Sequence, residues 1–412
     1  MTRSPFAALG ALWFLALTGC ASLPPDRTPA PVLLVSIDGL GAVQYDPARM
    51  PNLARIAREG ARADSMIPSY PTLTFPNHYS IVTGLHPDRH GIVHNTMRDA
   101  TLGGFWLSNR EAVGDGRWWG GTPVWVAAER AGLRAAAFFW PGTEADVGGT
   151  RPTRWRPYDG EIPMRTRVDT VLGWLAEPAA TRPRFMTLYF EHVDEASHSH
   201  GPHSPEAHAE QRAVDAALGR LLDGMDARGM AGAVNIVLVS DHGLADVPPG
   251  NTVIVEEMVD PADAELVTAG QVVGFIAKPG REAAAERALL GRHVHYQCWH
   301  KRDLPARWHY GTHPRVPPIL CQMDEGWDAV KRERLAQQPR TGMRGSHGFD
   351  PASASMHAVF FARGPAFRSG TVLPSIASVD VYPLLMRLLG IDAAPNDGDL
   401  APLLPALRDR AE

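Results

Sequence analysis

Residues 32–39 read VLLVSIDG, a continuous apolar run that ends at an acidic residue followed by glycine. A strand that is apolar on both faces is buried on both, which is typical of a parallel sheet covered by helices. In such sheets the chemistry gathers beyond the carboxyl ends of the strands. The run therefore predicts an α/β fold and places Asp38 at its functional edge.

Apolar runs and amphipathic segments alternate along the rest of the chain. Strands that alternate with helices predict a doubly wound, largely parallel sheet with helices on both faces. Strands are expected over 135–139, 185–190, 234–239 and 357–361, and helices over 52–59, 75–82, 205–228 and 379–389, with one more opened by Thr122-Pro123.

The composition excludes several classes of protein. With 44% apolar residues in 412 the chain is not intrinsically disordered, and three cysteines are too few for a disulfide-built scaffold. The net charge of −5 shows no basic excess, so we expect no binding to a nucleic-acid polymer.

The N-terminus has the layout of a secretory signal. Arg3 precedes an apolar run, residues 6–17, that is too short to span a bilayer. The segment 17–20, LTGC, resembles the lipobox of bacterial lipoproteins, in which the cysteine carries the lipid; the alternative is an ordinary cleaved signal with a chance cysteine at Cys20.

The lipobox resemblance implies how the chain is processed and located. Residues 1–19 would be removed as signal peptide, and the Pro-rich residues 20–31 would tether a lipidated Cys20 to the protein. Ala21, not Asp, follows the cysteine, and by resemblance to Gram-negative sorting rules this implies an outer-membrane anchor facing the periplasm.

After the tether we expect one large α/β domain over 32–392 and a C-terminal tail over 393–412. The region of about 293–327 breaks the alternation and is rich in His, Trp, Arg and Pro, so we interpret it as a loop-rich insertion beside the site. An oxidising compartment favours a disulfide between Cys298 and Cys321 within it; two separate buried thiols are the alternative.

Four short segments bring carboxylates and imidazoles to strand ends or glycine-flanked turns. Mixed carboxylate and imidazole ligands suit Zn²⁺, and six of them are enough for two metals about 3.5–4 Å apart, as in phosphoryl transfer. Singly, each Asp is more often a helix cap and each His an ordinary side chain, so the hypothesis rests on the joint pattern. The candidates are Asp38, Asp194, His198, Asp241, His242 and His347.

A fifth segment, residues 71–84, reads PTLTFPNHYSIVTG and offers a nucleophile. Thr74 lies immediately before a predicted helix with Pro76 at an early position, where free N–H groups and the helix dipole favour anions. Coordination to a metal would lower the pKa of its hydroxyl and activate it. The alternative is that Thr74 only caps the helix.

This segment, continued through residues 87–95, resembles the nucleotide pyrophosphatase/phosphodiesterase family of the alkaline phosphatase superfamily. The resemblance covers about 32–390, and the ligand segments occur in the family's order. It implies an alkaline phosphatase-like fold and two Zn²⁺. One zinc would be held by Asp38, Asp241 and His242 and approached by Thr74, and the other by Asp194, His198 and His347.

The resemblance also implies roles around the metals. Thr74 matches the nucleophile, Asn95 the side chain that hydrogen-bonds a phosphoryl oxygen, and Phe75 the aromatic that stacks on the nucleobase. Leu107 and Tyr158 fall where the family completes that slot, with ordinary packing as the alternative. Ser197 stands where the family often has glycine, a departure that removes no ligand.

The implied enzyme is a phosphoric diester hydrolase that acts through a phospho-threonine intermediate. It would convert nucleoside triphosphates, dinucleotides and phosphodiesters into nucleoside 5′-monophosphates. The alternatives are a related hydrolase of choline-phosphate or lysophospholipid diesters or of phosphonates, and a lipoprotein that uses the fold only for binding.

Overall fold

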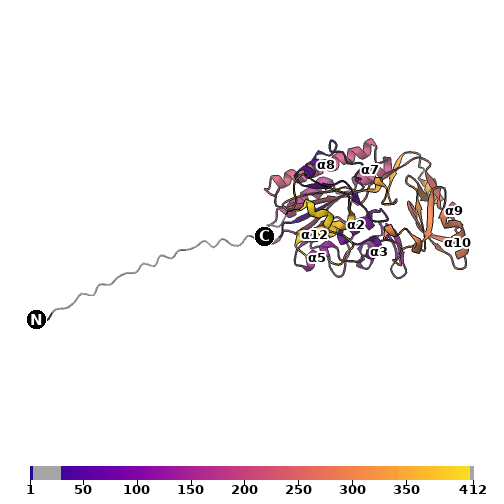
Figure 1. The fold of residues 1–412 in the computed structure, drawn as a ribbon, viewed down its shortest axis with the longest axis horizontal. Coiled ribbons are helices and arrows are strands. Elements are labelled where there is room, and N and C mark those ends of the chain that lie inside the picture. Colours follow the sequence, from indigo (N-terminus) through magenta and orange to yellow (C-terminus); the bar gives the residue numbers. More distant parts are fainter. Residues whose placement is uncertain (3–28, 339, 409–412) are drawn as a thin grey trace.

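The computed structural model describes residues 1–2, 29–338 and 340–408 (Figure 1). Nearly all of the predicted signal peptide, Cys20 and the tether as far as residue 28 lie outside the described residues. Within the described part of the chain, every helix is too short or too polar to cross a membrane.

A seven-stranded sheet forms the centre of the molecule, in the order β19-β2-β18-β8-β1-β7-β6. The strands β6, β7, β1 and β8 run parallel, and so do β2 and β19, whereas β18 is antiparallel to both of its neighbours, β8 and β2. The sheet is therefore mixed, with β18 as the one strand that runs against the other six. The bounds are β1 Val32–Ile37, β2 Ala61–Ala63, β6 Ala135–Phe138, β7 Phe185–Phe190, β8 Asn235–Val239, β18 Phe360–Arg363 and β19 Thr371–Leu373.

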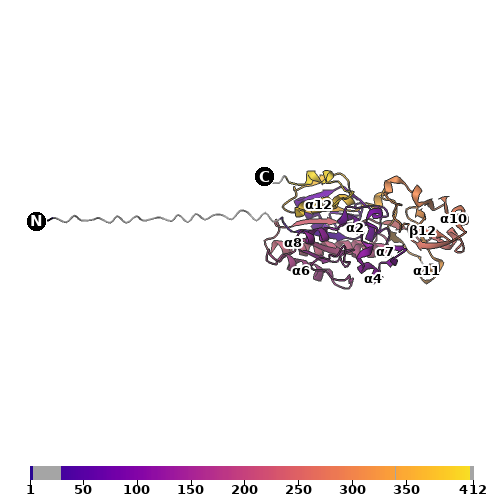
Figure 2. The ribbon, with the colours of Figure 1, turned by 90° about the horizontal axis from the view of Figure 1, so that it is seen from below.

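Helices cover both faces of this sheet (Figure 2). Val32 and Leu34 face one apolar core, and Leu33 and Val35 face the other, which explains the uninterrupted apolar run of β1. The first core is closed by α2 Thr74–Thr83, α5 Val124–Arg130 and α12 Val381–Leu389, and the second by α1 Pro51–Glu59, α6 Met164–Leu175 and α8 Pro205–Asp226.

A second sheet lies beside the first and differs from the predicted loop-rich insertion. It has five antiparallel strands in the order β11-β12-β15-β14-β13 and a separate apolar core. Two strands of this sheet, β14 and β15, lie within the range 293–327, so the long irregular stretch expected there is the connection between them. The sheet itself begins well before residue 293, with strands so short that they leave little pattern in the sequence. They are β11 Ala264–Thr268, β12 Val272–Ala277, β13 Gly291–Arg292, β14 Tyr296–His300 and β15 Ile319–Met323, with α9 Val255–Met258 and α10 Glu282–Leu289 beside them.

Further short elements connect the two sheets and the helices. They are β3 Met66–Ile67, α3 Pro87–His90, the hairpin β4 Thr96–Asp99 and β5 Gly103–Trp106, α4 Arg110–Gly114, α7 His192–His200, β9 Ala245–Val247, β10 Thr252–Ile254, β16 Asp328–Val330, α11 Arg332–Gln337, β17 Arg344–Ser346 and β20 Ile376–Ala377.

The two cysteines of the second sheet are joined. Cys298 of β14 stands directly opposite Cys321 of β15 in the antiparallel register, and their sulfurs form a disulfide. Both side chains are buried in the core of this sheet. The bond therefore ties together two neighbouring strands at some remove from the ends of the central sheet.

We expect the double variant Cys298→Ser/Cys321→Ser to lower the free energy of unfolding by about 2–4 kcal/mol, because the bond closes a loop between the two strands. Denaturant unfolding of wild type and variant measures this difference. Mass spectrometry of the unreduced wild type provides the control, and two free thiols at these positions would contradict the prediction.

Candidate active site

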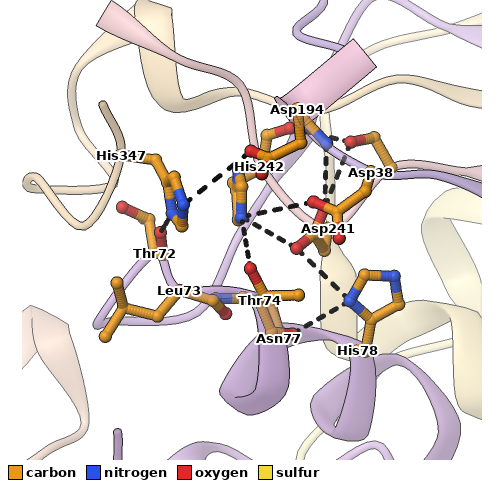
Figure 3. A network of polar contacts seen from close by, with 12 residues as sticks. Asp38, Thr72, Leu73, Thr74, Asn77, His78, Asp194, Asp241, His242 and His347 are labelled. Atoms are coloured by element: carbon orange, nitrogen blue, oxygen red, sulfur yellow. Dashed lines mark hydrogen bonds and ion pairs between the residues drawn. The ribbon is translucent and has the colours of Figure 1, made fainter. Parts of the chain in front are cut away.

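The candidate ligands converge where β1, β7 and β8 end (Figure 3). Asp38 follows β1 directly, Asp241 and His242 follow β8, and Asp194 lies in the first turn of α7, which follows β7. His347 reaches the same place from the end of β17. The parallel register of the three strands thus brings residues that are distant in sequence to a single edge of the sheet.

The polar atoms of these residues lie within contact distance of one another. His242 Nε2 is 2.8 Å from Asp241 Oδ2 and 3.7 Å from Asp38 Oδ1, and His347 Nε2 is 3.8 Å from Asp194 Oδ1. Two groups have ligand atoms close enough to hold a cation: Asp38, Asp241 and His242, and Asp194, His242 and His347. His242 belongs to both groups, so the two positions adjoin.

His198 stands at the outer rim of this cluster. Its Nε2 is 3.5 Å from Asp194 Oδ2, its ring centroid lies 4.9 Å from that of His347, and its side chain is 40% exposed. The four-residue spacing places both side chains on one face of α7, as the sequence predicted. The sixth predicted ligand is therefore adjacent to the second group.

The three histidines are oriented to offer a lone pair. Each turns its Nδ1 to a backbone carbonyl: His198 to Gly345, His242 to Gly243 and His347 to Thr72, at 2.9, 3.2 and 2.8 Å. Because a carbonyl only accepts, Nδ1 carries the proton in the neutral ring and Nε2 is left as the lone-pair atom. That atom faces carboxylates in each case, an arrangement that fits a cation between them.

The carboxylates support the same conclusion. Asp38 Oδ1, Asp194 Oδ1 and Asp241 Oδ2 are buried and have no hydrogen-bond partner. Burial, together with the charges of Asp241 and Asp194, raises the pKa of the Asp38 carboxyl well above its usual range. The buried Asp38 and Asp241 and the part-buried Asp194 thus gather negative charge in one place, and divalent metal ions fit this donor set.

Thr74 is the first residue of α2 rather than the residue before it. Its Oγ1 lies 3.3 Å from His242 Nε2, and α2 has no side-chain cap. The capping alternative therefore does not describe this hydroxyl, which points into the cluster (Figure 3).

Two residues of this cluster were not predicted from the sequence. Tyr189 of β7 donates to Asp38 Oδ2 at 2.5 Å, and His78 Nδ1 lies 3.3 Å from Asp241 Oδ2 and 2.9 Å from the Thr74 carbonyl. Unlike the three candidate ligand histidines, His78 has hydrogen-bond partners on both nitrogens, since Nε2 contacts Ser36 Oγ at 2.8 Å. Its four-residue spacing from Thr74 on one helix face is the signal that would have found it.

A cavity of about 460 Å³ is lined by Thr74 and by two of the candidate acidic ligands, Asp38 and Asp194. Phe75, Leu107 and Tyr158 all line it, so the structure brings the three predicted slot residues together beside the cluster. The remaining lining comes from Ser108, Arg110, Val113, Phe139, Trp140, Pro141, Gly142, Glu144, Tyr189, Glu191 and Glu195.

Asn95 lies beside the nucleophile segment. Its Oδ1 accepts a hydrogen bond of 3.0 Å from the backbone N–H of Phe75, the residue after Thr74. Because the oxygen is engaged there, the amide nitrogen is the atom left to donate. The side chain predicted to contact a phosphoryl group is thereby held against the first turn of α2, which also carries Thr74.

The end of β6 contributes strained backbone to the cavity wall. Phe139 and Trp140 have φ angles of 65° and 156°, which side chains other than glycine rarely adopt. Contacts from neighbouring elements hold them: Thr187 Oγ1 donates to the Phe139 carbonyl at 2.7 Å, and Trp140 Nε1 donates to the His78 carbonyl at 3.1 Å. Strain of this kind clusters at functional sites.

Comparisons with known proteins agree with this chemistry. The family model described as type I phosphodiesterase / nucleotide pyrophosphatase matches residues 32–350. A venom phosphodiesterase of Crotalus durissus collilineatus is 34% identical over 394 residues, which cover 93% of this chain and 47% of the venom protein. This chain thus spans about half the length of that relative.

Two solved structures superpose closely on the chain. Murine ectonucleotide pyrophosphatase/phosphodiesterase 5 has a TM-score of 0.86 at 31% identity, covering 92% of this chain and 100% of the other. An inactive variant of that mouse protein, with a threonine replaced by alanine and in complex with AMP, has a TM-score of 0.86 at 30% identity with the same coverage.

Proposed function

Because this chain belongs to the type I phosphodiesterase / nucleotide pyrophosphatase family, a family of phosphodiester hydrolases, we propose that it hydrolyses nucleoside triphosphates, dinucleotides and nucleotide diesters to nucleoside 5′-monophosphates. The observation that carries the proposal is the cavity that joins Thr74 and the acidic ligands to an aromatic slot. The AMP complex of the murine relative supports a nucleotide as the ligand of such a slot.

The family is metal-dependent, and we propose two Zn²⁺ as the cofactors. Asp38, Asp241 and His242 would hold one ion beside Thr74. Asp194, His198 and His347 would hold the other. Bound zinc lowers the pKa of hydroxyl groups and water and neutralises charge on phosphoryl oxygens.

Thr74 and Asn95 have different roles in the proposed reaction. The oxygen of Thr74 forms a bond to phosphorus while the leaving-group oxygen departs on the opposite side. Water next attacks the phosphorus of the threonine ester, which frees the nucleoside monophosphate and restores the hydroxyl. Asn95 donates its amide N–H to a phosphoryl oxygen as charge develops there. The inactivity of the threonine variant of the murine relative supports this role for Thr74.

The alternative substrate is a choline-phosphate diester, since rings and carboxylates together bind quaternary ammonium groups. Two of the cavity carboxylates are already neutralised, however: Glu144 forms an ion pair with Arg110, and Glu191 with Arg167. These two ion pairs reduce the negative charge that a quaternary ammonium group would meet in the slot, which supports a neutral nucleobase there.

Relative kcat/KM values on three substrates test the proposal: ATP, the p-nitrophenyl ester of TMP, and p-nitrophenylphosphorylcholine. We expect both nucleotides to be turned over more efficiently than the choline ester. Poor turnover of both nucleotide substrates beside good turnover of the choline ester would reject the nucleotide assignment.

We expect Phe75→Ala to raise KM for the p-nitrophenyl ester of TMP by roughly tenfold, because loss of base stacking costs about 1–3 kcal/mol. KM for methyl p-nitrophenyl phosphate, which carries no base, should change much less. Steady-state kinetics on the two esters measure the difference, and equal changes in KM would argue against stacking. Circular dichroism controls for folding, since Phe75 also packs near Phe105 and Trp119.

We further propose that the protein is a lipoprotein of the cell envelope, anchored through Cys20 to the outer membrane and facing the periplasm. The lipobox-like segment and the Pro-rich stretch after it support this location. Cys20→Ser should move the protein from the membrane fraction to the soluble fraction, and membrane retention of that variant would overturn the anchor.

A further inference from the structure

Tyr158 lies in the cavity although no regular structure holds the segment that carries it. The connection between β6 and α6, residues 139–163, contains no helix or strand. The ring is 40% exposed and lines the cavity with Phe75 and Leu107. An exposed ring on an irregular connection keeps one position only if other contacts fix its backbone.

Arg167 of α6 supplies such contacts. The side chain is completely buried, and all five of its N–H groups have acceptors. Two of these N–H groups bind the backbone of residues 158–162, the Tyr158 segment: Nε donates to the Ile162 carbonyl at 2.9 Å and Nη2 to the Gly160 carbonyl at 3.3 Å.

The other three donors of Arg167 attach that segment to the end of β7. They reach the Tyr189 carbonyl at 2.9 Å and both oxygens of Glu191 at 2.5 and 2.6 Å. Tyr189 and Glu191 themselves line the cavity. One guanidinium therefore fixes the Tyr158 segment against the strand that leads to the metal-ligating helix.

Further contacts continue from Arg167 to the Tyr158 ring. The guanidinium lies 5.1 Å from the centroid of the Phe139 ring, and the Phe139 ring meets Tyr158 edge-on at 5.1 Å. In addition, the Tyr158 backbone N–H donates to Glu144 Oε1 at 3.0 Å, and Arg110 pairs with that glutamate. The ring thus has a defined place only while these contacts persist.

We propose that Arg167 is a positioning residue for substrate selection: it clamps residues 158–162 to the end of β7 and thereby sets the width of the slot that receives the organic group of the diester. The proposal rests on the proposed function, since it concerns the same cavity. The five hydrogen bonds of the Arg167 guanidinium reach neither Thr74 nor a candidate metal ligand, so Arg167 acts through the Tyr158 segment and Glu191.

The variant Arg167→Lys tests the clamp, because an ammonium on a flexible stem has three donors and cannot bridge five acceptors. We expect kcat/KM for the p-nitrophenyl ester of TMP to fall about tenfold or more, because KM rises while kcat changes little. The value for methyl p-nitrophenyl phosphate, with the same leaving group, should stay near that of wild type, as should the zinc content. The matched control is Arg220→Lys, which alters an exposed pair between α8 and Asp169 of α6.

A double-mutant cycle separates positioning from general damage. Tyr158→Ala should reproduce the selective loss, and Arg167→Lys/Tyr158→Ala should lose little more than either variant alone, because the two act through one ring. Additive losses, an equal fall on both esters, or an unchanged ratio in Arg167→Lys would overturn the inference. If wild type itself shows no preference for the nucleotide ester, the proposed function falls and the inference with it.

Discussion

Thr74→Ala should abolish turnover while leaving the fold and the metal content intact. The Thr74 hydroxyl lines the cavity and points into the ligand cluster, with Oγ1 3.3 Å from His242 Nε2. Removing a nucleophile that acts in concert with its surroundings lowers kcat by a factor on the order of 10⁴ or more. The p-nitrophenyl ester of TMP provides the assay, and metal analysis of the same preparation gives the zinc content.

The physical reason for expecting an intact fold is that Thr74 caps nothing. The helix α2 begins at this residue without a side-chain cap, and the six other candidate ligands lie outside α2, so they should stay in place. Thr74→Ser is the matched control, since it keeps a hydroxyl at the same position and should retain measurable activity. Activity of Thr74→Ala close to wild type would overturn the mechanism, whatever the metal content.

His347→Ala should cost both metal and activity. The imidazole is buried, its Nδ1 is fixed on the Thr72 carbonyl, and its Nε2 lies 3.8 Å from Asp194 Oδ1. Without it the second group of ligands loses one of its two buried histidines. We expect turnover to fall by at least about 100-fold, and the variant to retain less zinc than wild type after dialysis.

Two controls distinguish the loss of a metal ligand from the general effect of removing a histidine side chain. His200→Ala, on the exposed end of α7, is the control and should retain both zinc equivalents and activity. Treatment of wild type with a chelator should abolish activity, and zinc should restore it, whereas added zinc should not restore His347→Ala. Full zinc occupancy in the His347→Ala variant would show that the residue is not a ligand.

The sequence predicted the site better than the details of the fold, for reasons that particular residues illustrate. Asp38, Asp241 and His242 follow apolar runs directly, so their convergence follows from parallel strands alone. Thr74 and Phe75 belong to a continuous motif. Contacts of this kind are local in sequence or imposed by sheet topology, and both leave a visible pattern.

The contacts that sequence analysis missed join distant segments through side chains of ordinary appearance. Tyr189 lies in an apolar run, and nothing around it indicates a hydrogen bond to Asp38. Arg167 looks in sequence like the exposed Arg165 of the same helix, yet its position against the Tyr158 segment and the end of β7 buries it. The antiparallel pairing of β18 and the second sheet depend likewise on tertiary packing, which overrides local preference.

The products formed from ATP, with zinc quantified in the same preparation, test the central claim most directly. Attack by Thr74 on the α-phosphorus predicts AMP and pyrophosphate as the only first products, from a protein that carries two zinc ions per chain. Formation of ADP and inorganic phosphate, or turnover that persists in a preparation stripped of zinc, would contradict the account.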